Sequence, residues 1–387
     1  MVELQEKRLK RIEEVKKDII KTATKRAEGA ANAVAARNKN LLLNDFEYSM
    51  GKITLDSSPE GIGIGAHYTC NGKCVFCLGG KPVLFSLKRY KEFFEPRLGN
   101  VLARADYVSF CGFGELLLMP QIEEFMDYVN KKMPWANKIY TTNGSALTNE
   151  NILSLFTKGR SAVQISLHAS YRELHKALTR LDSFDEIVSR IKQLISMRRS
   201  EGYPSVILVF LANSLNIENL PDFAEFAHRL GVDEVRCNYM TAFHHAQLKL
   251  SCFFKQGLTN QSMEEAEERA AKLGLPLKPP PRFGQWNQDK NNCLCADPWK
   301  YMYVENESSV LPCCYAGSHF GYLDKADFQT IWNGSSYRQL RKSLVEGPPH
   351  KWCRYCQRYR AENVNDIRSH INFRPGGIAK ILRGYKL

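Results

Sequence analysis

The stretch "GIGIGAHYTCNGKCVFC", residues 61–77, runs from a β-rich segment into a loop that holds three cysteines. Such a segment followed by a polar, glycine-containing loop is typical of a strand and the turn after it. The thiols of Cys70, Cys74 and Cys77 are one ligand short of a closed tetrahedral zinc site, for which His67 is the only near candidate. The same loop can wrap three corners of a four-iron, four-sulfur cluster and leave the fourth iron open to another ligand.

Six β-rich runs, the first of which begins this stretch, recur about thirty residues apart. Helical patterns such as "FDEIVSRIKQLISMRR" (184–199) lie between them. Alternating strands and helices with continuous apolar strands predict parallel β-structure that is buried on both faces. Six such units predict an α/β fold, either an incomplete barrel or an open doubly wound sheet. The runs cover residues 61–69, 105–113, 137–144, 162–170, 205–213 and 233–240.

The composition is that of a globular protein with a sizeable core, because 44% of the 387 residues are hydrophobic and 11% are aromatic. No apolar run approaches the length of a membrane span, so we expect no membrane association. The N-terminus is a charged helical pattern without the apolar centre of a secretory signal, and we expect a cytoplasmic protein. Twelve cysteines in a reducing compartment then favour metal or redox chemistry over disulfide bonds.

The formal charge of +13 raises the question of nucleic-acid binding, but its distribution argues against it. Residues 1–40 carry 11 Lys and Arg against 6 Asp and Glu, and residues 361–387 carry 5 against 2. The two ends therefore hold 8 of the 13 excess charges. A solvated basic arm and tail is the simpler interpretation, and an anionic substrate or partner stays open.

The regions on either side of the six repeated units have a different character. Residues 3–38 have the spacing of a long helix, which we interpret as an extension that packs on the main body. Beyond residue 241 the rhythm stops, and "KLGLPLKPPPRFGQWNQ" (272–288) is proline-rich like a linker. We predict an N-terminal helical extension (1–58), the repeated units (59–250), a linker (251–292), a cysteine-rich domain (293–360) and a basic tail (361–387).

The spacing C-x3-C-x2-C, placed after the first strand of a sixfold strand–helix pattern, resembles the radical S-adenosylmethionine superfamily. The resemblance implies a partial (β/α)6 barrel of the TIM type and a [4Fe–4S] cluster on Cys70, Cys74 and Cys77. It implies S-adenosylmethionine (SAM) as the cofactor, which the open iron chelates and one electron cleaves to a 5′-deoxyadenosyl radical. It also implies an electron donor such as flavodoxin or ferredoxin.

Other strand ends strengthen the resemblance. "CGFGELLL" (111–118) looks like the family's Gly-Gly-Glu motif, in which glycines let a ligand approach and Glu115 binds the methionine ammonium. "ISLHAS" (165–170) and "FLANSLN" (210–216) are similar to the segments that contact the rest of the cofactor, although an acid commonly occupies the His168 position. The implied SAM contacts are Phe76, Gly112, Gly114, Glu115, Ser166, His168 and Asn213.

A second cysteine region, "CLCADPWKYMYVENESSVLPCCYAG" (293–317) with a later C-x2-C, resembles the SPASM/Twitch extension that carries auxiliary iron–sulfur clusters. The implied ligands of one closed [4Fe–4S] cluster are Cys295, Cys313, Cys353 and Cys356. Cys293 and Cys314 leave two of these ligands open, and a four-cysteine zinc ribbon is the alternative. We favour the shorter Twitch form with one auxiliary cluster, because no cysteine follows Cys356. Ser308 stands where the family usually turns on glycine.

The resemblance implies an enzyme that abstracts hydrogen from an unactivated C–H bond. Relatives with this extension act on ribosomally made peptides, on proteins, or on sugars and aminocyclitols. We expect a peptide or protein substrate. The runner-up is oxidation or epimerisation of a carbohydrate- or aminocyclitol-like small molecule. The alternative from another class is a zinc-bearing RNA-binding protein, which would use the basic ends and the two cysteine groups.

The fate of the substrate radical separates these products. Some relatives use a cavity thiol as a hydrogen-atom donor. Cys252 and Cys237 are the candidates here, because of their positions in the sequence. Epimerisation would need such a thiol. A closed auxiliary cluster can accept an electron but cannot chelate substrate, so we expect an oxidative outcome.

Overall fold

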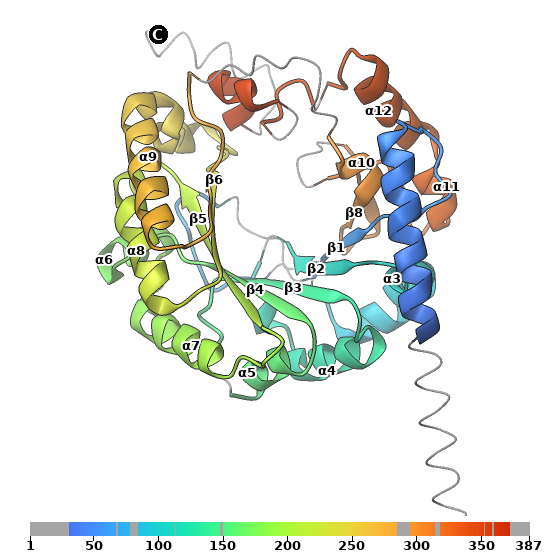
Figure 1. Ribbon diagram of the computed structural model, residues 1–387, viewed down its shortest axis with the longest axis horizontal. Helices are drawn as coiled ribbons and strands as arrows, with labels where there is room; N and C mark the ends of the chain where they lie inside the picture. Colours follow the sequence, from blue (N-terminus) through green and yellow to red (C-terminus); the bar gives the residue numbers. More distant parts are fainter. Residues whose placement is uncertain are drawn as a thin grey trace, which may run out of the picture.

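The computed structural model describes residues 31–66, 69–77, 84–112, 114–147, 150–284, 295–313, 318–351, 353–357 and 360–371 (Figure 1). All six predicted β-runs form strands, and each pairs in parallel with the next. They are β1 (Gly61–Gly65), β2 (Tyr107–Cys111), β3 (Asn137–Thr142), β4 (Ser161–Ser166), β5 (Ser205–Ala212) and β6 (Glu234–Tyr239). The prediction of an α/β fold with a partial barrel is confirmed.

The sheet continues beyond the six strands at both edges. Within the described residues its order is β10-β9-β8-β1-β2-β3-β4-β5-β6-β7. β7 (Leu277–Lys278) pairs in parallel with β6, and β8 (Tyr301–Val304) pairs in parallel with β1. β9 (Ser309–Leu311) and β10 (Gly321–Tyr322) follow in antiparallel pairing. The barrel and the cysteine-rich region therefore share one sheet.

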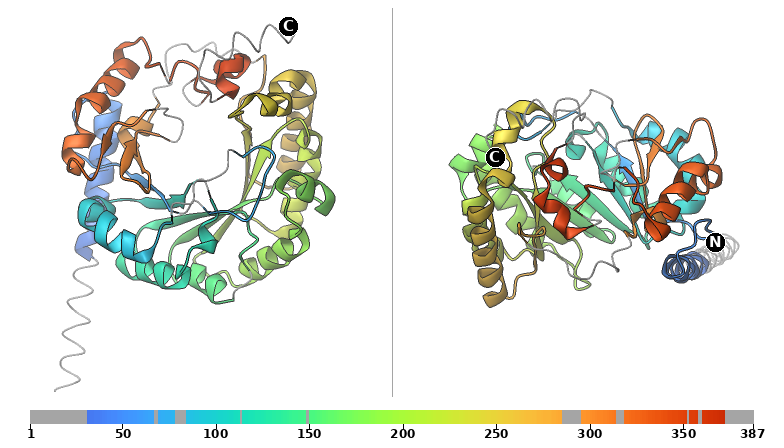
Figure 2. Two further views of the ribbon diagram at one scale, coloured as in Figure 1. Left: turned by 180° about the vertical axis from the view of Figure 1, so that it is seen from behind. Right: turned by 90° about the horizontal axis from the view of Figure 1, so that it is seen from above.

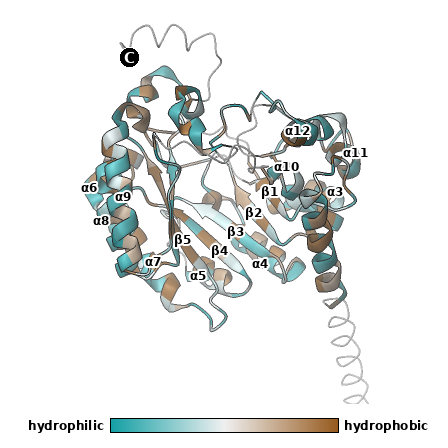
Figure 3. Cartoon of the chain, turned by 45° about the horizontal axis from the view of Figure 1, so that its top comes forward, coloured by the Kyte–Doolittle hydropathy of each residue, from teal (hydrophilic) through white to brown (hydrophobic). Residues whose placement is uncertain are grey.

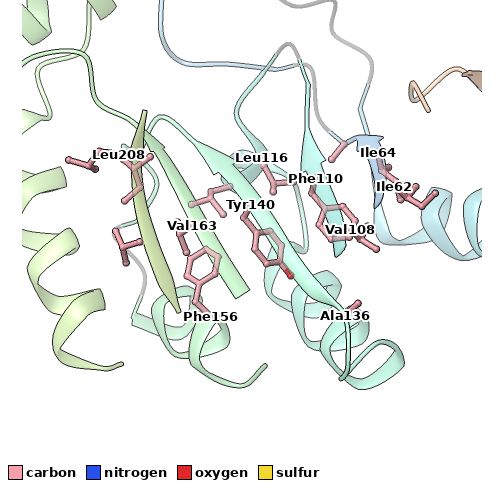
Figure 4. Close-up of a cluster of buried hydrophobic side chains, with 14 of the residues drawn as sticks. Ile62, Ile64, Val108, Phe110, Leu116, Ala136, Tyr140, Phe156, Val163 and Leu208 are labelled. Atoms are coloured by element: carbon pink, nitrogen blue, oxygen red, sulfur yellow. The ribbon is translucent and has the colours of Figure 1, made fainter. Parts of the chain in front are cut away.

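Helices cover the outer, convex face of the curved sheet (Figure 1). Apolar strand residues such as Ile62, Phe110 and Val163 are fully buried beneath them (Figure 4). Gly231, with φ +78°, ends α8. Among the described residues, no helix has the length and apolar content to cross a membrane. The helices of this layer are α3 (Glu95–Leu102), α4 (Ile122–Lys132), α5 (Glu150–Thr157), α6 (Arg172–Thr179), α7 (Phe184–Ser196), α8 (Leu220–Leu230) and α9 (Gln256–Lys272).

The inner face of the sheet differs from the prediction of strands buried on both sides. Alternate residues of β2, β3 and β6 stay partly accessible, while their neighbours are buried under the helices. On β1 the inner positions are glycines covered by tyrosines. A Cβ at Gly61 would lie 2.0 Å from the Tyr107 ring, and a Cβ at Gly63 would lie 2.0 Å from the Tyr301 hydroxyl. Only glycine fits beneath these rings.

The N-terminal extension packs on the cysteine-rich region. Residues 31–49 are helical, eleven residues beyond the predicted end, and residues 3–30 of the predicted helix lie outside the described part. Asn44 Nδ2 donates to the Trp299 carbonyl (2.8 Å). Arg341 Nη1 donates to the Ile53 carbonyl (3.0 Å) just after the helix. The extension thus lies beside α10 (Asp297–Lys300), α11 (Phe328–Trp332) and α12 (Ser335–Glu346), as Figure 2 shows.

The segment expected to be a linker, residues 251–292, is ordered secondary structure over its described part. It holds the seventeen-residue helix α9 and strand β7. The sequence pattern did not predict this helix, because most of its buried positions are small or polar residues. Figure 3 shows mixed hydrophilic and hydrophobic residues along α9. Likewise the start of the expected tail, residues 361–371, forms two short 3₁₀ helices.

Candidate active site

The cysteine loop, residues 69–77, follows β1 at the edge where the parallel strands end. The Glu115 N–H, just after β2, donates to the Thr69 carbonyl (2.8 Å). The Val75 N–H donates to the Leu178 carbonyl (2.9 Å) at the end of α6. In barrels of this type, loops from several strands converge at this edge to form the active site.

A buried glutamine holds the loop from its other side. Gln247 lies in the 3₁₀ helix His245–Leu250 after β6 and is 2% exposed. Its Nε2 reaches the carbonyls of Val75 (3.3 Å) and Cys77 (3.2 Å), while its Oε1 accepts from the Phe243 N–H (2.9 Å). The sequence reading did not include Gln247, and its isolated position offered no motif that could have revealed it.

The three thiols of the loop fit a shared cluster. A Cβ at Gly72 would lie 3.6 Å from the sulfurs of both Cys70 and Cys74, so the loop curls tightly between them. Burial, together with the neighbouring Cys77 and Cys70, raises the pKa of Cys74 to about 12. Such a thiol becomes a thiolate when it binds a metal, and iron–sulfur clusters supply the positive charge for three thiolates at once.

The geometry of the described residues supports a single metal ion at the cysteine loop less well than a cluster. Within the described part of the chain, no three His, Cys, Asp or Glu side chains lie close enough to hold one metal ion. A four-iron cluster binds each cysteine through a different iron atom, so its ligand sulfurs stand further apart. His67, the near candidate for a fourth zinc ligand, lies outside the described residues.

Glu115 is buried at the site and is 1% exposed, and its carboxylate is turned toward β3. It accepts hydrogen bonds from Thr142 Oγ1 (2.6 Å), the Asn143 N–H (2.5 Å) and the Leu117 N–H (3.0 Å). Burial raises the pKa of Glu115, and these three donors oppose that rise. The carboxylate thus joins the ends of β2 and β3. A direct bond to the methionine ammonium stays a prediction.

Asn143, immediately after β3, is a site residue that the sequence reading missed. Its Nδ2 donates to Asn71 Oδ1 (3.0 Å) and lies 3.7 Å from Cys70 Sγ. Its Oδ1 accepts from Ser145 Oγ (2.6 Å). The signal was available, because "TTNG" places polar residues at the same strand-end edge as the cysteine loop. An N–H near the sulfur stabilises a thiolate, so Asn143 is placed to support Cys70, the predicted cluster ligand.

The side chains of Phe76 and His168, both predicted to contact the cofactor, pack against each other. Their rings meet edge-on with centroids 4.9 Å apart. His168 Nδ1 accepts from the Leu211 N–H (3.2 Å). Burial, first of all, lowers the pKa of His168 to about 3, and the imidazole is neutral at pH 7. His168 is 5% exposed and packs behind Phe76, and its predicted contact with the cofactor stays a prediction.

The remaining predicted contacts divide into two kinds. Asn213 is fully buried, and its amide is used within its own turn, with bonds to the Leu211 carbonyl (3.0 Å) and the Leu215 N–H (3.0 Å). The side chain therefore shapes its own loop, and its predicted contact with SAM stays a prediction. Ser166 ends β4 on the partly accessible face. Gly112 and Gly114 follow β2 at the same edge, and their contact with SAM stays a prediction.

The candidate hydrogen-atom donors Cys237 and Cys252 are both buried in the main core. Cys237 is in register with Phe210, whose ring packs on Phe223 of α8 (4.9 Å). Both cysteines belong to the core, with exposures of 3% and 1%. Burial raises the pKa of Cys252 to about 12, and the Thr259 hydroxyl of α9 opposes the rise. Because strand side chains alternate, Cys237 faces the helices, and Cys252, which begins the 3₁₀ helix Cys252–Lys255, is packed in the same core. A role for either thiol as hydrogen-atom donor stays a prediction.

The second cysteine site forms around a hairpin. β8 and β9 pair in antiparallel register, with Tyr303 opposite Leu311, so the segments before β8 and after β9 lie at the same end. Cys295 and Cys313 occupy these segments. Burial, then the neighbouring Cys295 and Cys356, raises the pKa of Cys353 to about 12. These thiols fit the predicted auxiliary cluster. The alternative ligands Cys293 and Cys314 lie outside the described residues.

The hairpin turn explains the unusual serine in this region. Ser308 has φ +104°, a backbone conformation that favours glycine. Its hydroxyl donates to Asp324 Oδ1 (2.6 Å), and its N–H donates to the Glu305 carbonyl (3.0 Å). The side chain is 2% exposed. The prediction that this position is the family's glycine turn agrees with its backbone.

The fold and the two thiol sites define an iron–sulfur enzyme built on a partial barrel. Residues 66–227 match the Radical SAM superfamily, and residues 293–357 match SPASM, an iron–sulfur cluster-binding domain. The chain therefore belongs to the radical SAM superfamily and carries a SPASM domain after its barrel. SAM, its [4Fe–4S] cluster and an auxiliary iron–sulfur site follow from this membership, which confirms the predicted cofactors.

Two kinds of relatives are similar to the chain. A probable GTP 3′,8-cyclase from Saccharolobus islandicus is 28% identical over 228 residues, which cover 56% of this chain and 66% of the relative. The chain thus spans just under two thirds of that protein. SuiB from Streptococcus suis, bound to precursor peptide SuiA, shares the fold with a TM-score of 0.57 and 13% identity, covering 87% and 74% of the two chains. The structure of anSMEcpe with AdoMet and the Cp18Cys peptide has a TM-score of 0.56 at 15% identity, covering 77% and 87%.

Proposed function

We propose that the protein is a radical SAM enzyme that modifies a peptide or protein. When bound, the cluster and SAM supply a 5′-deoxyadenosyl radical that abstracts hydrogen from a C–H bond of the substrate. The chain's own residues fix the loop that holds the cluster, through Glu115, Asn143 and Gln247. They also provide the inner face of the sheet, on which the substrate would lie.

The observation that carries the proposal is the accessible and nearly uncharged inner face. Its tyrosines and small polar residues offer hydrogen bonds and flat apolar surface, the mixture on which peptides bind. An extended peptide presents backbone amides and varied side chains rather than a concentrated charge. The partly accessible or exposed uncharged polar residues of this face include Ser109, Thr141, Gln164, Ser166 and Asn238.

A nucleoside triphosphate would need a different surface. Triphosphates are held by unpaired Arg and Lys side chains. Among the described strand positions of the inner face, the basic residues are Arg236 and Lys278, and both form ion pairs with Glu234. The sequence similarity to GTP 3′,8-cyclases favours GTP as the second candidate substrate. The paired charges favour the peptide.

The test compares the two substrate classes directly. The reconstituted full-length enzyme, with SAM and dithionite, is incubated either with peptides encoded by short reading frames beside its gene or with GTP. We expect 5′-deoxyadenosine to form together with a peptide whose mass has fallen by two hydrogens. The Cys70→Ala variant is the matched control and should form neither product, because it lacks one ligand of the SAM-binding cluster.

A nucleotide product in place of a modified peptide would contradict the proposal. Conversion of GTP to a cyclised product, with every peptide mass unchanged, would replace the peptide assignment by the nucleotide one. Running the peptide reaction in deuterated water separates oxidation from epimerisation. We expect no solvent deuterium at the reacting carbon, because Cys237 and Cys252, the candidate hydrogen-atom donors, are both buried in the main core.

A further inference from the structure

Residues 360–371, here called the C-terminal strap, leave the auxiliary cluster site and return to the barrel. The strap consists of the 3₁₀ helices Ala361–Asn365 and Ile367–His370, followed by Ile371, and is drawn in red in Figure 1. Its first part is tied to a cluster ligand, because Asn363 Nδ2 donates to the Cys356 carbonyl (2.9 Å). A second bond joins Gln357 Nε2 to Ser369 Oγ (3.0 Å).

The other end of the strap is anchored in the barrel by a buried histidine. His370 is 1% exposed, and its ring lies among Tyr239, Phe253 and Phe283 with centroid distances of 5.3, 5.6 and 5.5 Å. Its carbonyl accepts from the Ala242 N–H (2.8 Å) just after β6. These contacts fix the position of the next residue.

That next residue, Ile371, packs on the apolar cluster that also supports the cysteine loop. It forms a parallel bridge with Ala242 and packs on a small apolar cluster that is separate from the main core. Cys74 and Val75 of the cysteine loop pack on the same cluster, and Phe76 is one of its buried members. The other members are Leu178, Met240, Ala242, Leu248 and Leu250. A continuous series of contacts thus joins Cys356 of one cluster site to Cys74 of the other.

We propose that Ile371 is a positioning residue, through which the C-terminal strap holds the cysteine loop in the shape that binds SAM. A loop held by a few backbone hydrogen bonds keeps alternative arrangements unless side chains pack against it. Ile371 removes those alternatives by completing the apolar cluster to which Phe76 belongs and on which Cys74 packs. Because the strap begins at a ligand of the auxiliary cluster, the state of that site and the affinity for SAM are coupled. The inference does not depend on which substrate the enzyme uses.

The first test is Ile371→Ala in the full-length reconstituted enzyme, with SAM binding measured by calorimetry. We expect SAM to bind about five- to tenfold more weakly, with unchanged iron content. Ile371→Leu, which keeps the apolar volume, should restore binding. Ile367→Ala is the matched control, because Ile367 is a buried isoleucine of the same strap that is not part of the Phe76 cluster. Equal weakening in Ile367→Ala, or none in Ile371→Ala, would overturn the proposal.

The second test asks whether the two sites are coupled through the strap. Cys353→Ala, which removes an auxiliary ligand, should also weaken SAM binding, and adding Ile371→Ala should weaken it little further. Fully additive effects would overturn the coupling. Before reconstitution, alkylation of Cys74 should be faster in Ile371→Ala than in Ile367→Ala, with buried Cys252 as the internal reference. If Ile371→Ala fails to fold, Ile371→Val supports the same comparison with a smaller expected change.

Discussion

At the scale of single residues, the acidic side chain of the Gly-Glu motif shows how a site residue can act through the protein itself. Glu115 is the acceptor of three hydrogen bonds, and two of them, from Thr142 and Asn143, join the end of β2 to the end of β3. The motif correctly places it at the site edge, but a motif does not reveal where a carboxylate points. That direction depends on Thr142 and Asn143, which come from another strand.

We predict that Glu115→Gln lowers the free energy of unfolding by about 1.5–3 kcal/mol, because bonds to a charged acceptor are lost. Gln also turns one acceptor into an NH2 group that faces a donor. Urea denaturation of the chain before reconstitution measures the change. SAM binding should weaken by about tenfold or more if Glu115 also meets the ammonium. Equal unfolding curves would contradict the bonding role, whatever the effect on SAM.

Acid sensitivity is the second residue-scale prediction. Burial lowers the pKa of His168 to about 3, so the unfolded chain binds a proton below its ordinary pKa of 6.5 while the folded chain does not. Stability contributed by the neutral imidazole is therefore present above pH 6.5 and lost as the pH falls toward 3. Between pH 7 and pH 5 we expect a loss of about 2 kcal/mol from this residue. His168→Asn, compared with wild type over this range, should show a shallower decline, and parallel curves would contradict the assignment.

At the scale of elements, the prediction succeeded where a repeated pattern fixed the structure. The six barrel strands were found from their apolar runs, and the cysteine loop from its spacing. Helix α9 was missed because Thr259, Ser262 and Ala266 are among its buried residues, and small polar side chains carry no hydrophobic period. The burial of Cys237 and Cys252 could not be predicted from the sequence, because it depends on the register of β6 and on the packing of α9, the helix that was missed.

The β8–β9 turn provides the prediction at this scale. Ser308 holds a backbone conformation that costs a side-chain residue about 1–3 kcal/mol, which its bond to Asp324 partly offsets. Ser308→Ala keeps the strain and loses the bond, whereas Ser308→Gly loses both. We expect the glycine variant to be more stable than the alanine variant by about 1 kcal/mol, measured by thermal unfolding. An alanine variant as stable as the glycine variant would show that the turn relaxes.

At the scale of the whole molecule, two cysteine groups at two places on one sheet predict two separable cluster sites. Replacing Cys70, Cys74 and Cys77 with alanine should leave about half of the wild-type iron and sulfide after reconstitution. Replacing Cys295, Cys313, Cys353 and Cys356 should remove the complementary half. Iron and sulfide analysis of both variants provides the measurement. Complete loss in either variant would mean that the sites do not form independently, and no loss would remove that group from the ligands.

The pairing of β1 with β8 has a consequence during biosynthesis. Gly61 pairs with Tyr301, so the first barrel strand leaves the ribosome long before its outer neighbour. At about 5–20 residues per second, β1 waits roughly 10–50 s with one edge unpaired. Throughout this interval the tyrosines at 301 and 303 cannot cover the glycines of β1, and the nascent sheet presents a bare strand edge to other chains. Ribosome pausing before codon 301 would lengthen that exposure, so the yield of folded enzyme should depend on translation speed and on chaperones that shield strand edges.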